Sequence, residues 1–310
     1  MTKKSSLCAF CAALMLAFTA SLLAQTSPWP FPSSPHGVAA AGGDARAVTV
    51  GFWNIQWFPG RRPDSNKAEQ TSQTNSVHAD MRQLNVDILG MEEVRDFASA
   101  GLAVQPLKGF KVDVCANFPA RAGQTETQQV AITSRLQPLS AWAEEWKPAG
   151  SLVPPRGFAF AAYEPIPRHL LLVYVLHLKS NRGEAPEDIS LRQESIKQLQ
   201  SHMEAMQKAY SGLGSISWII GGDFNTAPDD ARFASETTIR SLIAGGFTWS
   251  WKNMPPSAHI TMPPDSRFPA AGFDHMFYRG ATMRRAAVAN TSSQSSDHRA
   301  IVATFELPAP

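Results

Sequence analysis

Ile220-Gly221-Gly222-Asp223-Phe224-Asn225 is the stretch in which an apolar segment of this 310-residue chain gives way to polar side chains. Residues 216–221 are rich in isoleucine and carry a tryptophan, which predicts a strand. A buried strand has no structural use for a carboxylate at its tip unless another group satisfies the charge. Asp223 and Asn225 alternate, so an extended chain presents both side chains to one side. The stretch therefore predicts a strand that ends in a functional site.

Four further segments have the same form, an apolar strand followed by acidic or amide side chains. They are Phe52-Trp53-Asn54, Gly90-Met91-Glu92-Glu93-Val94, Gly272-Phe273-Asp274-His275 and Ser296-Asp297-His298-Arg299. Converging carboxylates and amides with no cysteine nearby form a hard, oxygen-rich site. Such a site suits Mg²⁺, Mn²⁺ or Ca²⁺ better than zinc.

Short β-rich runs separated by turn residues predict nine strands. They cover residues 48–54, 87–91, 110–114, 129–133, 157–163, 170–178, 216–221, 274–278 and 300–305. Apolar residues spaced by three, four and seven predict an amphipathic helix over 186–210, and a second helix is expected over 68–84. Many strands with few helices favour two packed sheets covered by helices over a doubly wound parallel sheet. Since there is no internal repeat, we expect one domain.

The residues at these strand ends occur in a recognisable order. The ordered set Trp53-Asn54, Glu93, His177-Leu178-Lys179-Ser180, Gly222-Asp223-Phe224-Asn225, Asp274-His275 and Ser296-Asp297-His298 resembles the endonuclease/exonuclease/phosphatase superfamily. The resemblance covers the chain after residue 47 and implies a catalytic domain over 47–308. It implies an α/β four-layer sandwich, in which two packed, mostly antiparallel β-sheets are flanked by helices and the site lies at one end.

The resemblance also implies a metal site. Matching positions assign Asn54, Glu93 and Asp297 as metal ligands, with Glu93 the principal one. The expected ion is Mg²⁺ or Mn²⁺, with Ca²⁺ as an alternative. Glu92 stands where a glutamine often precedes the metal-binding glutamate, so either member of the adjacent pair is a candidate ligand.

Five further residues receive catalytic roles from the resemblance. Asp223 and Asn225 would position the attacking water and the phosphate, and His177 would donate to the phosphoryl oxygen. His298 would be the general acid/base, oriented by Asp274. The chemistry needs these types in any case, because an anionic phosphodiester requires charge neutralisation, an activated water and a protonated leaving group. A histidine paired with an aspartate supplies the proton transfer near neutral pH.

Each of these residues also has a structural reading. His298 follows a serine-rich loop and alone suits a surface histidine, Asp223 alone suits a turn, and His177 alone suits a core histidine. Glu93 alone suits a helix cap. The pattern as a whole favours the catalytic reading, because all six motifs occur together. For His275 we retain the structural reading, since it faces away from Asp274 along a strand.

The substrate is predicted from local positive charge. Lys179 and Arg182 follow His177, and Arg61 and Arg62 follow the first strand, so these four are expected to bind phosphates of DNA or RNA without sequence preference. Trp57 and Phe58 are candidates for base stacking, with loop packing as the alternative.

Other functions stay open on this fold. A phosphatase or a lipid phosphodiesterase, acting on an inositol phosphate or sphingomyelin, is the first alternative, with the aromatic stretch 247–251 as a candidate membrane surface. A non-catalytic binding protein is the remote one. It would lack at least one catalytic group, and none of the expected set is missing.

The first 46 residues have a different composition. Lys3 and Lys4 precede an apolar run over 7–24, which predicts a secretory signal peptide over 1–25, with an uncleaved anchor as the alternative. Residues 26–46 are rich in proline, serine and glycine and predict a flexible linker. We therefore expect a secreted or periplasmic monomer without a stable membrane anchor.

Removal of the signal changes the charge and the cysteine count. Without Lys3 and Lys4, the 28 basic residues fall to 26, which equals the 26 acidic residues. A neutral protein has no overall basic footprint, so a polyanion must be held by a local patch. Cys115 is left as the single cysteine, and its apolar alternating neighbours predict a buried, inert thiol.

Overall fold

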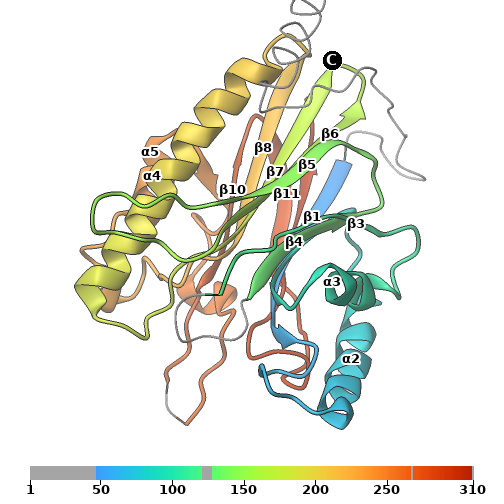
Figure 1. The fold of residues 1–310 in the computed structure, drawn as a ribbon. Coiled ribbons are helices and arrows are strands. Elements are labelled where there is room, and N and C mark those ends of the chain that lie inside the picture. The colour runs from blue at the N-terminus through green and yellow to red at the C-terminus, as the bar shows by residue number, and fades with distance from the viewer. Residues whose placement is uncertain (1–46, 121–127, 267, 309–310) are drawn as a thin grey trace, which may run out of the picture. The chain divides into compact units, whose positions relative to one another are not determined.

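The computed structural model describes residues 47–120, 128–266 and 268–308 (Figure 1). The expected signal peptide (1–25) and linker (26–46) lie outside the described residues. Among the described helices, none combines the length and the apolar character needed to cross a membrane.

The first sheet has six strands in the order β11–β12–β1–β2–β4–β3. Their bounds are β1 Ala47–Phe58, β2 Ile88–Val94, β3 Lys111–Cys115, β4 Gln129–Ser134, β11 Thr282–Val288 and β12 Ile301–Glu306. Every neighbouring pair is antiparallel except β1 and β2, which run parallel.

The second sheet repeats this plan in the order β5–β6–β7–β8–β10–β9. Its strands are β5 Pro138–Glu145, β6 Gly157–Ile166, β7 His169–His177, β8 Ser215–Asp223, β9 Thr248–Trp249 and β10 Asp274–Arg279. Only β7 and β8 are parallel. The prediction of two mostly antiparallel sheets is confirmed, with one parallel pair at the centre of each.

The two sheets pack face to face around a shared apolar core. Phe52 of β1, Val175 of β7 and Ile219 of β8 are fully buried in one cluster. A Cβ atom on Gly221 would lie 2.3 Å from the Phe52 ring, so the absent side chain makes room for that ring. Burying a phenylalanine contributes about 1.5–3 kcal/mol, and the core holds many such side chains.

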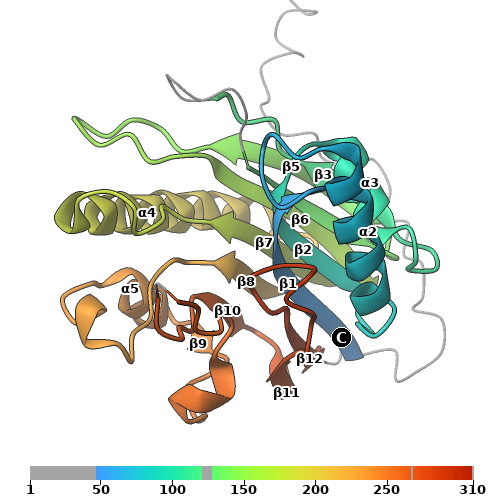
Figure 2. The ribbon, with the colours of Figure 1, turned by 90° about the horizontal axis from the view of Figure 1, so that it is seen from below.

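Helices cover the outer faces of both sheets, as Figures 1 and 2 show. They are α2 Lys67–Met81 and α3 Phe97–Val104 on the first sheet, and α4 Ala185–Tyr210 and α5 Thr238–Ala244 on the second. Two 3₁₀ turns, Ala231–Phe233 and Pro256–His259, complete the helical elements of the described chain. The four-layer arrangement is confirmed, and both expected helices are present.

The elements that sequence patterns missed are short or lie at edges. The edge strand β5 begins with a proline and carries two glutamates and two alanines, all poor strand formers, and its side chains are half-exposed. The two-residue β9 and the seven-residue α5 are too short to show a period.

Strand direction brings the expected site residues to one end of the sandwich. β7 and β8 run parallel and end together, with His177 opposite Asp223. β10 is antiparallel to β8 and begins there, with Asp274 opposite Asp223. In the first sheet β1 and β2 end on the same side, and Ile301 at the start of β12 pairs with Phe52. Asn54, Glu93 and the 292–298 loop therefore reach the same end.

Gly222 is required for this arrangement. Its φ is +128°, and an added Cβ would lie 2.1 Å from the Leu176 carbonyl oxygen and 2.7 Å from a Glu92 carboxyl oxygen. We predict that Gly222→Ala lowers the free energy of unfolding by roughly 2 kcal/mol or more, from backbone strain and overpacking. Urea denaturation measures this loss. Gly212→Ala is the control, because no atom lies within 4 Å of its Cβ position. Equal stabilities of the two variants would contradict the prediction.

Candidate active site

Three strands of the second sheet place their acidic and histidine side chains side by side. His177 ends β7, Asp223 ends β8 and Asp274 begins β10, in direct register. All three are buried, with exposed fractions of 2% or less. His298 enters from the loop before β12, and its Nδ1 lies 2.8 Å from Asp274 Oδ2 and its Nε2 3.9 Å from Asp223 Oδ2. The expected His298–Asp274 pair is therefore present.

The first sheet contributes Asn54 and Glu93. The Asn54 amide nitrogen donates to Glu93 Oε1 at 3.2 Å and to Asp223 Oδ2 at 3.1 Å, which joins the two sheets. Glu93 has a φ of +60° at an irregularity in the β2–β4 pairing, and Trp57 N–H donates to its Oε2 at 3.1 Å. The Asn54 side-chain oxygen accepts from Gln56 N–H at 3.1 Å. In this arrangement Asn54 orients both carboxylates, and its role as a metal ligand stays a prediction.

Asp297 lies at the solvent-exposed edge of the site. Its side chain is exposed, and its backbone N–H donates to Gln56 Oε1 at 3.2 Å. Burial, and next the negative charge of Asp297, raise the pKa of Glu93. Two carboxylates that repel one another at a partly open edge are the oxygen donors that a divalent cation prefers. Glu93 and Asp297, with Asn54 beside them, fit Mg²⁺ or Mn²⁺.

Asp223, Asp274 and His298 form a second group whose ligand atoms all lie within 4.8 Å of one another. Burial alone would lower the pKa of His298, but the charges of Asp274 and Asp223 raise it well above its usual value. His298 is therefore an imidazolium, which holds the carboxylates together by charge. Metal binding by this group would require His298 to release its proton.

His177 is the neutral histidine of the site. Burial, and next the charge of Arg156, hold its pKa well below the usual value. Its Nε2 lies 3.6 Å from Asp223 Oδ2 and 3.8 Å from Glu93 Oε1. A neutral imidazole carries one N–H and can donate to a phosphoryl oxygen without competing for the cation.

Asn225 differs from its expected geometry. Its φ is +52°, so the chain after Asp223 turns and does not remain extended. Its backbone N–H donates to Asp223 Oδ1 at 2.9 Å, and its side-chain amide donates to the Leu178 carbonyl at 3.2 Å. The expectation of two parallel side chains was wrong, because this local hydrogen bond from the backbone to Asp223 favours a turn.

The structure distinguishes Glu92 from Glu93. Glu92 is fully buried, and neither carboxyl oxygen has a hydrogen-bond partner among the described residues. Burial, and next the charges of Asp274 and Asp223, raise its pKa well above the usual 4.5. Burial therefore favours the neutral form of Glu92 beneath the site, and Glu93 is the member of the pair that reaches Asn54.

The four expected phosphate-binding residues divide into two groups. Lys179 Nζ pairs with the buried Asp188 at 2.6 Å, and Arg62 pairs with Glu69 at 2.7 Å. Both side chains are held in ion pairs, and their assignment to a phosphate track stays a prediction. Arg61 Nε donates to Gln56 Oε1 at 2.7 Å, one hydrogen bond away from Asp297. Arg182 is exposed and has no ion pair within the part of the chain that the structure describes.

Arg156 is a basic residue of the site that the sequence did not indicate. It donates to the His177 carbonyl at 2.9 Å and to the Leu178 carbonyl at 2.6 Å, and its charge lowers the pKa of Glu93. A single arginine between Pro155 and a strand belongs to no recognisable pattern. Only the fold brings it beside β7.

The aromatic candidates are largely internal. Phe58 is fully buried and cannot stack on a base, whereas Trp57 is half-buried. Phe247 and Trp251 are buried, so the stretch 247–251 is no exposed membrane surface. The Trp251 indole N–H donates to the Asp274 carbonyl at 3.2 Å.

The structure bears on two residues that were given structural readings, and it shows Cys115 half-buried rather than buried as expected. His275 Nε2 lies 2.8 Å from the Thr226 carbonyl oxygen, and burial lowers the pKa of His275 to about 4. Burial raises the pKa of Cys115 to about 12, so its thiol is inert at neutral pH.

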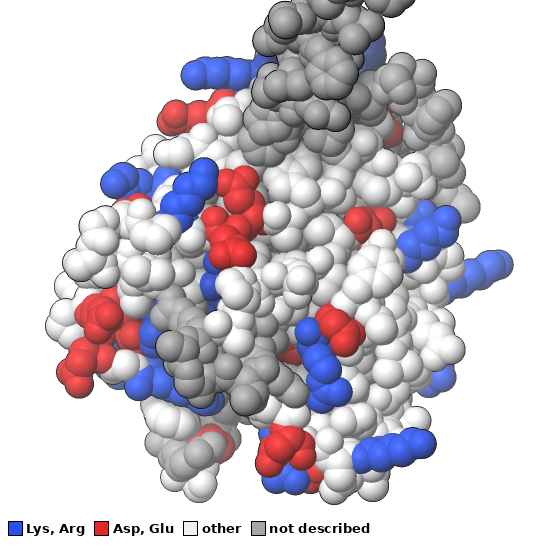
Figure 3. Space-filling view, in the orientation of Figure 1, with Lys and Arg blue, Asp and Glu red and all other residues white. Residues whose placement is uncertain are grey.

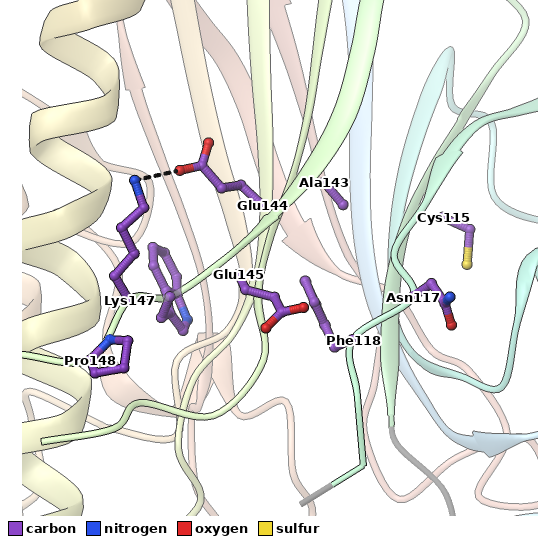
Figure 4. A pocket seen from close by; sticks show the side chains of 9 residues that line it. Cys115, Asn117, Phe118, Ala143, Glu144, Glu145, Lys147 and Pro148 are labelled. Atoms are coloured by element: carbon purple, nitrogen blue, oxygen red, sulfur yellow. Dashed lines mark ion pairs between the residues drawn. The ribbon is translucent and has the colours of Figure 1, made fainter. Parts of the chain in front are cut away.

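Two other surface features lie outside this constellation. A cavity of about 660 Å³ between the edge strands β3 and β5 is lined by Cys115, Phe118 and Glu145, with Lys147 paired to Glu144 at 3.5 Å (Figure 4). It contains none of the expected catalytic residues. On the face shown in Figure 3, basic and acidic side chains alternate and form no continuous basic surface.

The fold and this site define a class, an α/β-sandwich hydrolase of phosphoric esters. The model of the Endonuclease/Exonuclease/phosphatase family matches residues 51–298, and the chain belongs to this family, whose members are metal-dependent phosphoric ester hydrolases. A search of the curated proteins found no match.

Solved structures of the same family resemble the chain. An endonuclease/exonuclease/phosphatase from Beutenbergia cavernae has a TM-score of 0.63 and 18% identity, covering 85% of this chain and 72% of that one. The human Nocturnin catalytic domain has a TM-score of 0.60 and 16% identity, and the match covers 84% of this chain and 95% of that one. D. rerio TDP2, solved with a single-strand DNA product, has a TM-score of 0.58 and 15% identity, and the match covers 84% of this chain and 99% of that one. At these identities the likeness shows the fold.

The buried Glu92 makes a pH-dependent stability prediction. Its folded pKa is raised above 4.5, so the wild type loses stability as pH rises from about 4.5 toward the folded pKa. Glu92→Gln removes the ionisable group. We predict that the free energy of unfolding of the variant, relative to that of wild type, increases by roughly 1.4 kcal/mol per pH unit in that window. Urea unfolding in chelator between pH 4 and 8 measures the difference. A difference that is constant with pH would contradict a neutral buried Glu92.

Proposed function

We propose that this protein is a divalent-metal-dependent phosphodiesterase that hydrolyses DNA or RNA with little sequence preference. The observation that carries the proposal is the meeting of Glu93 and Asp297 with an imidazolium His298, itself held by Asp274. A cation site and a proton donor thus lie at one edge of the sandwich. These are the two requirements of phosphodiester hydrolysis.

Each side chain has a task in the proposed reaction. A Mg²⁺ ion at Glu93 and Asp297 supplies charge neutralisation when bound. Asp223, with Oδ1 held by Asn225 N–H and a pKa raised by burial to about 7, binds and orients the attacking water. His177 donates its N–H to a phosphoryl oxygen, and His298 stabilises or protonates the departing oxygen.

Nucleic acid is favoured by the basic residues around the site. Arg182 is exposed near His177, Arg61 lies one hydrogen bond from Asp297, and Arg156 lies at the end of β7. Contacts to phosphates carry no base information, so such a site is indifferent to sequence. The DNA product of the TDP2 structure supports the same substrate class. The burial of Phe247 and Trp251 gives no support to a membrane-bound lipid substrate.

We further propose that the enzyme acts outside the cytoplasm as a monomer. The charged start and apolar run of residues 1–25 support export. Mass measurement of protein recovered from the periplasm or medium tests cleavage near residue 25. Full-length chain retained in the cell would contradict export.

The substrate class is tested by incubating the purified protein with plasmid, single-stranded DNA, RNA, sphingomyelin and inositol phosphates. Each reaction runs with Mg²⁺ or with chelator. We expect cleavage of nucleic acids that requires Mg²⁺. Turnover of sphingomyelin or an inositol phosphate alone would reject the nuclease but keep the phosphoesterase, and full activity in chelator would reject the metal mechanism.

Removal of the proton donor tests the mechanism. We predict that His298→Ala lowers kcat by about 10²- to 10⁴-fold, the usual contribution of a general acid/base. Circular dichroism should match that of wild type. The matched control is His78→Ala on α2, whose Nε2 lies 2.7 Å from the Leu102 carbonyl oxygen of α3. Near-normal turnover by His298→Ala would exclude its catalytic role.

The phosphate contacts are tested by a charge reversal. We predict that Arg182→Glu raises KM for plasmid severalfold and spares hydrolysis of bis-p-nitrophenyl phosphate, because only long DNA reaches flanking positions. The effect should shrink with added salt. Arg168→Glu, in the turn at the opposite end of β7, is the matched control. If the two variants cleave plasmid equally fast, Arg182 does not contact the substrate.

A further inference from the structure

Helix α2 carries two polar side chains on the face that packs against the rest of the protein. Gln73 is 2% exposed and Asp80 is 6% exposed, on the same face as the apolar Val77 and Met81. A buried amide costs free energy unless it is hydrogen-bonded, so these side chains must satisfy particular partners. Their partners lie on two loops of the active site.

Both the nitrogen and the oxygen of the Gln73 amide are hydrogen-bonded to the end of β1, the turn after it and the 292–298 loop. Its Nε2 donates to the carbonyls of Ile55 at 2.8 Å, Gln56 at 3.0 Å and Ser295 at 2.8 Å. Its Oε1 accepts from Arg61 N–H at 3.2 Å and from Gly60 N–H. One side chain therefore bridges the 54–61 segment and the 292–298 loop.

These two segments carry opposite sides of the cation site. The 54–61 segment holds Asn54 and the Trp57 N–H that binds Glu93 Oε2. The 292–298 loop holds Asp297, two residues after Ser295. The Asp297 charge raises the pKa of Glu93, so the two carboxylates repel one another. The Gln73 hydrogen bonds hold together the two segments that carry them.

We propose that Gln73 is a positioning residue that sets the gap between Glu93 and Asp297, and thereby the affinity for the divalent cation. The inference rests on the proposed function, since it concerns the same metal site. Gln73 touches neither substrate nor cation, and it acts through the two loops. Residues that orient metal ligands in this way typically change metal affinity 10- to 100-fold when replaced.

Asp80 keeps the 292–298 loop attached when Gln73 is changed. Asp80 Oδ2 accepts from Ser292 N–H at 2.9 Å and from Ser295 Oγ at 2.5 Å. The loop therefore has an independent anchor two turns along α2. Variants of Gln73 should fold with the loop in place and the gap no longer fixed.

The test measures Mn²⁺ binding directly by electron paramagnetic resonance, without substrate. Gln73→Met keeps the length of the side chain and removes all five hydrogen bonds. Gln73→Glu keeps the acceptor for the Arg61 N–H and loses the three donor contacts. The matched control is Gln70→Met on the same helix, whose amide donates to Ser65 and not to either metal-side segment.

We expect both Gln73 variants to bind Mn²⁺ at least 10-fold more weakly than wild type, and Gln70→Met to bind it normally. Excess Mn²⁺ should restore kcat in the Gln73 variants, and their circular dichroism in chelator should match that of wild type, which separates weaker binding from unfolding. Wild-type affinity in a folded Gln73 variant would overturn the inference, and if Gln73→Met does not fold, Gln73→Glu decides. Absence of Mn²⁺ binding by wild type would instead reject the proposed function.

Discussion

The repulsion among carboxyl groups at one end of the sandwich is the constraint on which the rest of the site depends. Five such groups meet there, namely Glu92, Glu93, Asp223, Asp274 and Asp297. Burial and mutual repulsion raise the pKa of Glu92, Glu93 and Asp223, and Asp223 reaches about 7. Unpaired buried charge is among the costliest features a fold can carry. The molecule offsets it by proton uptake at Glu92, by the imidazolium of His298 and by the Asn54 amide.

The fold serves this cluster by controlling direction and spacing. A parallel pair at the centre of each sheet ends four strands on one side, which brings their carboxyl ends together. Positive φ angles at Glu93 and Asn225 turn the chain where the strands stop. Helix α2 then ties the 54–61 segment to the 292–298 loop through Gln73. The remaining repulsion, between Glu93 and Asp297, is the part that the proposed divalent cation would relieve.

Much of this architecture could be predicted from sequence, because the strands at its centre are long, apolar and end in polar residues. The resemblance to the family pairs His298 with Asp274, and the two side chains lie 2.8 Å apart. The edge strand β5 escaped prediction because half-exposed residues lack a clear alternation. The ion pair of Lys179 with Asp188, nine residues away on α4, was not predicted, because the sequence does not reveal where that helix lies.

Arg156 and Gln73 could not be found in the sequence for a different reason. Gln73 binds backbone carbonyls and N–H groups, and Arg156 binds two backbone carbonyls besides the Gln128 side chain, so no pairing of opposite charges marks either residue. Asn225 was placed on the right element with the wrong geometry, because one local hydrogen bond to Asp223 decides its φ. Such positions depend on the tertiary fold, which a one-dimensional pattern does not contain.

The central claim is that the cluster exists to hold a divalent cation between Glu93 and Asp297. A crystal grown with Mn²⁺ tests it most directly, because the ion has an anomalous signal that the protein atoms lack. The account predicts an anomalous peak within about 2.5 Å of a Glu93 carboxyl oxygen, with Asp297 on its other side. A crystal saturated with Mn²⁺ that shows no peak there, or a peak bound only by other residues, would contradict the account.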